Sequence, residues 1–111
     1  MSKIKELGEF GLIHRLSSRL KFRASTTVLG IGDDCAVYPV KSGANEVIST
    51  DALVEDIHFK LSTTTPEALG RKALSVSLSD IAAMGGTPKR VLVTLGIPKK
   101  ISVSFLDRLY T

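Results

Sequence analysis

Acidic residues in the middle of a basic chain place the strongest constraint on how this sequence can fold. The formal net charge is +4, yet six of the eleven acidic residues lie in three central segments, at residues 33–34, 51–56 and 80, that are bounded by apolar residues. They are Asp33, Asp34, Asp51, Glu55, Asp56 and Asp80. Crowded carboxylates cost free energy unless a positive group compensates them. No run of Lys or Arg is interleaved there, so we expect a bound cation, held by separate segments, rather than a network of salt bridges.

Size and composition favour one domain and exclude several functional classes. A chain of 111 residues with 43% hydrophobic content can bury a single core. Its basic residues are scattered, with only pairs such as Arg71–Lys72 and Lys89–Arg90, which indicates a solvated surface and no nucleic-acid partner. The single cysteine, Cys35, allows neither an internal disulfide nor a zinc site. No apolar stretch reaches the length of a membrane span, so we expect a cytoplasmic protein without a membrane partner.

The hydrophobic pattern predicts an α/β (α+β) domain, with a mixed sheet of several strands backed by helices. Apolar residues recur at helical spacing in three segments and form short β-prone runs in three others. The expected helices cover residues 4–20, 66–84 and from 104 onward, and the expected strands cover residues 36–40, 47–51 and 91–97. The final helical pattern has no stop signal behind it, so we expect the chain to be a fragment.

The helix over residues 66–84 is the most clearly delimited element. Thr65 precedes a proline and an acidic residue, which is typical of a helix start, and Gly85 supplies a stop. On this helix Asp80 falls in line with Leu69, eleven residues earlier, at about 100° per residue. We therefore expect Asp80 to point where apolar residues point and not to be an ordinary solvated carboxylate. The alternative is an acid near the helix end that bonds a neighbouring loop.

The other acidic segments have plain interpretations when each is taken alone. Asp33 and Asp34 follow two glycines and could be an Asp-rich turn, while Ser49, Thr50 and Asp51 could be a polar strand end. Neither a dinucleotide-binding glycine motif nor a phosphate-binding P-loop is present, and the acids are not spaced as in an EF-hand. In combination, however, hydroxyl and carboxylate oxygens from separate segments are what a hard cation needs.

Three segments, in this order along the chain, resemble the N-terminal domain of the thiamine-monophosphate kinase family. They are residues 30–37 (GIGDDCAV), 49–59 (STDALVEDIHF) and 72–88 (KALSVSLSDIAAMGGTP). That family belongs to the aminoimidazole ribonucleotide synthetase-like superfamily. The resemblance implies that fold, several Mg²⁺ ions, ATP as co-substrate and transfer of the γ-phosphate of ATP to thiamine monophosphate, which gives thiamine diphosphate. It also implies a homodimer formed through the N-terminal domain.

The same resemblance assigns roles to individual residues. The implied magnesium ligands are Asp34, Ser49, Thr50, Asp51 and Asp80. Asp51 and Asp80 are the implied catalytic residues, Asp33 and Asp34 the implied nucleotide-binding residues, and His58 the implied contact to the substrate. Two positions depart from the family pattern, which usually has glycine at Asp56 and asparagine at Ser77. These departures bear on local geometry and leave the implied ligands in place.

By this resemblance, residues 1–111 are part of an N-terminal ATP- and magnesium-binding domain, and the C-terminal domain is absent. We therefore expect the fragment to be inactive alone. The nearest alternatives are another enzyme of the superfamily, such as selenide, water dikinase or a hydrogenase maturation factor. Residues 55–59 argue against those enzymes. An alternative of another class is a non-catalytic module for cation binding or dimerisation.

Overall fold

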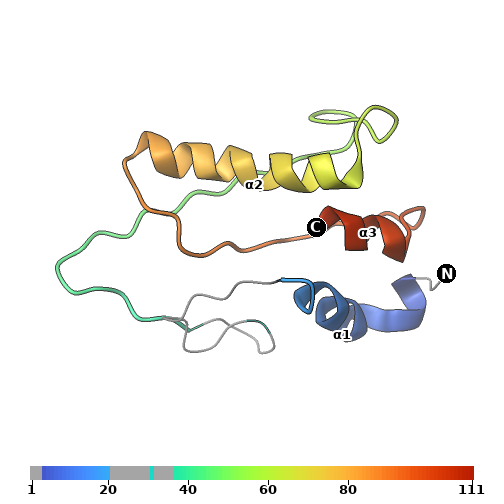
Figure 1. Ribbon diagram of the computed structural model, residues 1–111, viewed down its shortest axis with the longest axis horizontal. Helices are drawn as coiled ribbons and strands as arrows, with labels where there is room; N and C mark the ends of the chain where they lie inside the picture. The colour runs from blue at the N-terminus through green and yellow to red at the C-terminus, as the bar shows by residue number, and fades with distance from the viewer. Residues whose placement is uncertain (1–3, 21–30, 32–36) are drawn as a thin grey trace.

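The computed structural model describes residues 4–20, 31 and 37–111. In these ranges the chain forms three helices, α1 (Ile4–Ser17), α2 (Pro66–Ala83) and α3 (Val103–Leu109). Figure 1 shows α1 and α3 at one end of an elongated molecule, with α3 between α2 and α1, while α2 extends from there toward the opposite end. Long non-helical segments before and after α2 run along that helix toward the opposite end. The helices therefore provide the packed part of the structure.

Local capping residues set the ends of α2, as the sequence predicts. The backbone N–H of Ala68 donates to the Thr65 side chain over 3.1 Å, and Pro66 occupies the first turn. At the other end Gly85 has a φ of +71°, a conformation that favours glycine because it has no Cβ. The Gly86 N–H then donates to the Ile81 carbonyl over 3.0 Å. These contacts confirm the predicted start and stop of this helix.

The hydrophobic core lies between α1 and α3. Leu12, Leu16 and Leu106 form its buried centre. The partly buried residues packed against this centre are Ile4, Leu7, Ile97, Ile101, Phe105, Leu109 and Tyr110. Because these residues come mainly from α1, α3 and the segment just before α3, apolar burial is concentrated at this end of the molecule.

An ion-pair cluster fastens the same two helices together. Asp107 is buried on α3, and its carboxylate accepts from Arg15 Nε at 2.9 Å and Arg15 Nη2 at 2.6 Å. Arg19 Nη2 lies 3.1 Å from the same carboxylate. Hydrogen bonding from Arg15 is the main reason that the pKa of Asp107 is lowered. The buried charge is thus compensated by two cations that lie at and beyond the end of α1.

The predicted mixed sheet is wrong for the part of the chain that the structure describes. The segments 37–40, 47–51 and 91–97 contain no strand, and pairing within residues 4–20, 31 and 37–111 goes no further than isolated bridges. Ile48 is 81% exposed and Leu92 is 90% exposed. High β-propensity describes how a residue fits a packed pleated surface, and it forms no strand without a neighbouring strand to bond. These apolar runs remain extended or irregular because they do not pair.

Candidate functional site

Two of the predicted magnesium ligands lie in hydrogen-bond contact. Ser49 Oγ donates to Asp80 Oδ2 over 3.1 Å, although the residues are 31 positions apart. Ser49 belongs to the extended segment before α2, and Asp80 lies in the last turn of that helix. The neighbouring Val47 also approaches this helix end, since a Cβ built on Gly86 would lie 3.8 Å from Val47 Cβ. The segment 47–49 therefore runs beside the C-terminal end of α2.

The surroundings of Asp80 correct the expectation that this acid is not an ordinary solvated carboxylate. Leu69 is buried, but Asp80 is exposed, as are Leu74 and Leu78 on the same helix. Only the N-terminal part of α2 lies beside α3 (Figure 1), and the apolar residues near its later turns, such as Pro88 and Val91, leave Leu74 and Leu78 exposed. The Asp80 carboxylate is consequently a solvated group whose hydrogen bond to Ser49 leaves its other oxygen accessible.

Of the remaining predicted metal- and nucleotide-binding residues, the structure describes Thr50 and Asp51. Thr50 and Asp51 are exposed, and Asp51 Oδ1 accepts the backbone N–H of Ala52 over 2.8 Å. Asp33 and Asp34 lie outside the described residues. Among the residues that the structure describes, no group of three or more His, Cys, Asp or Glu side chains could hold a metal ion. The described part thus brings Ser49 and Asp80 together without forming a complete metal site.

His58 lies in a hydrogen-bonded loop formed by residues 54–59, which we call the His58 loop. Its Nδ1 accepts the backbone N–H of Val54 over 2.9 Å. Asp56, in the same loop, has a φ of +65°. The loop is attached at two points, because Lys72 Nζ donates to the His58 carbonyl over 2.7 Å and Lys100 Nζ lies 3.0 Å from the Glu55 carboxylate. The predicted substrate contact is therefore held by a defined local structure.

Sequence reasoning missed both lysines of this arrangement. Lys72 and Lys100 each belong to a basic pair that we interpreted as solvated surface. A bond from a lysine to a backbone carbonyl leaves no mark in residue type or spacing, because any residue at position 58 would offer the same acceptor. The only relevant signal is that Lys72 lies eight residues before Asp80 on one helix. The sequence alone gives no reason to connect it with His58.

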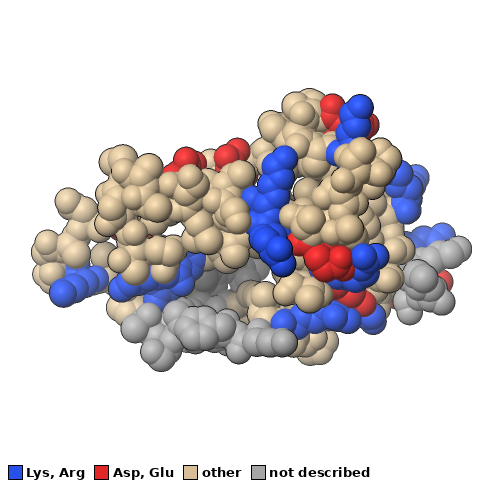
Figure 2. Space-filling model, turned by 45° about the horizontal axis from the view of Figure 1, so that its top comes forward, with Lys and Arg blue, Asp and Glu red and all other residues tan. Residues whose placement is uncertain are grey.

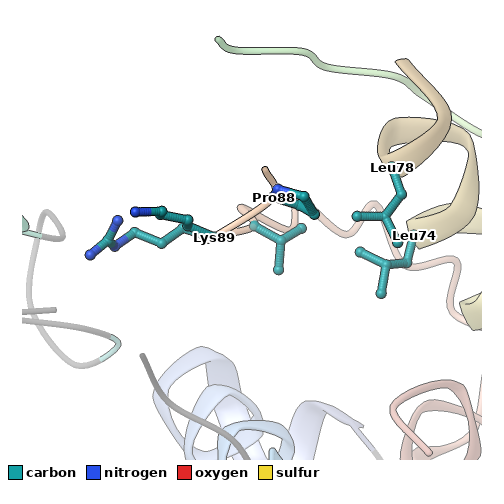
Figure 3. A pocket seen from close by; sticks show the side chains of 6 residues that line it. Leu74, Leu78, Pro88 and Lys89 are labelled. Atoms are coloured by element: carbon teal, nitrogen blue, oxygen red, sulfur yellow. The ribbon is translucent and has the colours of Figure 1, made fainter. Parts of the chain in front are cut away.

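A shallow pocket of about 270 Å³ lies elsewhere on α2. Its lining consists of Leu74, Leu78, Pro88, Lys89, Arg90 and Val91. Figure 3 shows Leu74 and Leu78 projecting from α2 on the side where Pro88 lies. The Arg90 guanidinium lies 4.2 Å from the centre of the Tyr38 ring, so this cation also contacts an aromatic face. The pocket contains none of the predicted ligands.

Basic and acidic side chains are interspersed on the surface. Figure 2 shows Lys and Arg in several separate groups on one face, with Asp and Glu between some of them. One such contact is the pair formed by Arg108 and Glu67, which connects α3 to α2 and lowers the pKa of Glu67 through hydrogen bonding. None of the described helices has the length and apolarity needed to cross a bilayer.

Comparison with protein families identifies the larger group to which this chain is related. Residues 32–111 match the family described as AIR synthase related protein, N-terminal domain. This match covers well over half of the chain. The chain belongs to the family of AIR synthase related proteins. The family match includes all of α2 and α3, together with the predicted site residues from Asp33 to Asp80 and the His58 loop.

Several curated relatives of this chain carry the same name. The chain is 48% identical over 104 residues to thiamine-monophosphate kinase of Bacillus subtilis, which covers 94% of this chain and 32% of the relative. It is 42% identical to the Aquifex aeolicus protein of the same name, covering 97% of this chain and 33% of the relative. The Escherichia coli protein of that name is 44% identical over 82% of this chain and 28% of its own length. The chain spans about a third of the length of these relatives. No solved structure matches it significantly.

Proposed function

We propose that this chain is part of a thiamine-monophosphate kinase and supplies the N-terminal ATP- and magnesium-binding region. The observation that carries the proposal is the 48% identity to the Bacillus subtilis enzyme over nearly the whole chain. The reaction is transfer of the γ-phosphate of ATP to thiamine monophosphate, giving thiamine diphosphate. Because ATP is the donor, we expect this reaction in the cytoplasm.

The oxygen groups near the end of α2 have the chemistry that magnesium requires. Ser49 and Asp80 offer a hydroxyl and a carboxylate 3.1 Å apart, and Asp51 offers a further exposed carboxylate. In the proposed site they act with Thr50 and Asp34 as ligands, and Asp33 contributes to nucleotide binding. Bound Mg²⁺ would neutralise charge on the transferring phosphoryl group. The acceptor is a phosphate oxygen that is ionised near neutral pH, so no side chain of this chain needs to remove a proton.

His58 is the proposed contact to thiamine monophosphate. Since its Nδ1 accepts a backbone N–H, the side chain can present its other nitrogen, Nε2, as a donor to an anionic group. We also propose that the chain pairs with a second copy. Support for this comes from Ile48, Leu92 and their apolar neighbours, which are exposed in the single chain and would lose contact with water in an interface.

Exchange into a relative would test the proposed function directly. We suggest replacing the matching third of the Bacillus subtilis enzyme by this chain and measuring thiamine diphosphate formation from ATP and thiamine monophosphate. The chimera should be active with Mg²⁺, and Asp80→Asn in the inserted chain should abolish activity. A folded chimera that forms no thiamine diphosphate would contradict the proposal. Turnover of ATP with selenide instead would favour a selenide, water dikinase activity.

A further inference from the structure

Backbone hydrogen bonds close the His58 loop on itself. The Val54 carbonyl accepts the N–H of Ile57 at 3.1 Å and that of His58 at 2.9 Å. The Asp56 N–H donates to the Phe59 carbonyl over 2.7 Å, and Glu55 and Phe59 form an isolated bridge. The loop thus satisfies several of its own polar groups without belonging to a sheet or a helix.

The contact between Val54 and His58 determines which nitrogen of the imidazole carries the proton. A backbone N–H can only donate, so the Nδ1 atom that it meets at 2.9 Å must be an acceptor without hydrogen. In the neutral ring the hydrogen is then on Nε2. The His58 side chain is exposed, so this Nε2–H is available to a ligand. A neutral donor of this kind suits a phosphate oxygen as its acceptor.

Lys72 connects this loop to the helix that carries Asp80. Its ammonium group lies 2.7 Å from the His58 carbonyl, and no residue other than His58 is bonded to it among the described residues. Lys72 and Asp80 are eight residues apart on α2, which corresponds to about 12 Å along the axis. Lys72 therefore defines the position of His58 relative to Asp80, at the far end of the same rigid element.

We propose that Lys72 is a positioning residue, which holds the His58 loop on α2 so that the Nε2–H of His58 meets the phosphate group of the acceptor substrate. The inference rests on the proposed function and deepens it. Lys72 acts through His58 and does not itself touch the substrate. Lys100 supports the same loop through Glu55, three residues before His58. Lys72 bonds the carbonyl of His58 itself, so Lys72 is the lysine that acts more directly on the position of the imidazole.

The first test measures loop structure in the whole 111-residue chain. Nitrogen-15 NMR should show Nδ1 of His58 as the unprotonated nitrogen and Nε2 as the protonated one, and the Val54 amide should exchange slowly with solvent. Lys72→Met should accelerate exchange at Val54 about tenfold or more, whereas Lys72→Arg should largely restore protection because Arg can also donate to a carbonyl. Lys60→Met is the matched control, since Lys60 borders the loop and its ammonium group forms no hydrogen bond or ion pair with the described residues.

The second test measures substrate binding in the chimera described above. Lys72→Met should raise KM for thiamine monophosphate about tenfold, leave KM for ATP unchanged and alter kcat little, because it removes positioning of a substrate contact. Lys60→Met should change none of these values. Unchanged exchange at Val54, or faster exchange with an unchanged KM, would overturn the proposal.

An inactive wild-type chimera would contradict the proposed function, yet it would still leave a decisive test of Lys72. In that case the 111-residue chain is titrated with inorganic phosphate while the NMR signals of the His58 ring are followed. Weaker phosphate binding in Lys72→Met than in Lys60→Met supports the positioning role. Equal binding in the two variants, or no response of the wild-type ring, overturns it.

Discussion

A methyl group added at Gly70 provides the sharpest test of how α2 packs on α3. A Cβ at this position would lie 2.1 Å from the carbonyl oxygen of Leu109 and 3.1 Å from its carbonyl carbon. Both atoms belong to backbone, so no side-chain rotation relieves the overlap. To reach an ordinary contact of 3.4 Å, the oxygen must move away by about 1.3 Å, which is 3.4 minus 2.1. Such a movement displaces the end of α3 from the core.

Two opposing effects decide the sign of the change in stability for Gly70→Ala. Replacing glycine by alanine inside a helix stabilises it by about 1 kcal/mol. Forcing an extra group into a packed contact costs about 1–3 kcal/mol, and the upper end applies because the obstacle is backbone. We therefore expect a net loss of about 2 kcal/mol in the free energy of unfolding. For a domain of this size, that corresponds to a melting temperature lower by roughly 10 °C.

Gly11→Ala is the matched control for this measurement. Gly11 lies inside α1, and a Cβ there would contact only the Leu7 side chain, at 3.4 Å from its Cβ and 4.0 Å from its Cδ2, which are ordinary contacts. This variant should gain about 0.5–1 kcal/mol from helix propensity alone. Urea unfolding followed by circular dichroism at 222 nm measures both variants. A gain of stability in Gly70→Ala equal to that of Gly11→Ala would refute the close approach of α2 and α3.

Three further predictions concern charge and association. Mg²⁺ at about one hundred times its dissociation constant should stabilise the chain by about 2.7 kcal/mol, which thermal melts would measure. Asp51→Asn should remove this gain. It should scarcely change the stability of the metal-free protein, since Asn can keep the hydrogen bond to Ala52. Arg15 binds the ionised form of Asp107 and lowers the pKa of its carboxyl. Urea titrations should therefore show a stabilising contribution that is full above the unfolded value of about 3.9 and is lost as pH falls through the lower folded pKa. Asp107→Asn should be destabilised at pH 7, and its deficit relative to the wild type should shrink as the pH is lowered below about 3.9. Light scattering at high micromolar concentration should detect self-association, and a strictly monomeric mass would count against pairing through the exposed 91–95 segment.

The predictability of α2 and the failure of the predicted sheet have the same physical origin. The start of α2 depends on Thr65 and Pro66, and its stop depends on Gly85, so each boundary is determined by residues within four positions of it. A strand at 91–97 requires a partner from elsewhere in the chain, and no local pattern reveals whether that partner is in place. Leu92 fits a strand equally well whether or not a neighbour pairs with it.

The candidate site divides in a similar way. The sequence predicted that the segments of Ser49 and Asp80 would meet, because separated oxygen groups of these types suit one cation. Their hydrogen bond agrees with that expectation for this pair alone. The contact from Lys72 to the His58 carbonyl was not predictable, since it depends on the backbone path of a loop rather than on the identity of residue 58. Side-chain chemistry is visible in a sequence, whereas a backbone acceptor is not.

Asp56 shows how the loop geometry explains a departure from the family pattern. The resemblance to thiamine-monophosphate kinases implies glycine at this position, and Asp56 has a φ of +65°, the left-handed conformation that glycine adopts without strain. Among other residues, Asp and Asn are those that tolerate this conformation best. Its N–H still donates to the Phe59 carbonyl over 2.7 Å. The substitution therefore keeps the turn that closes the His58 loop, at a modest conformational cost, so His58 can retain the contact with Val54 that fixes its proton on Nε2.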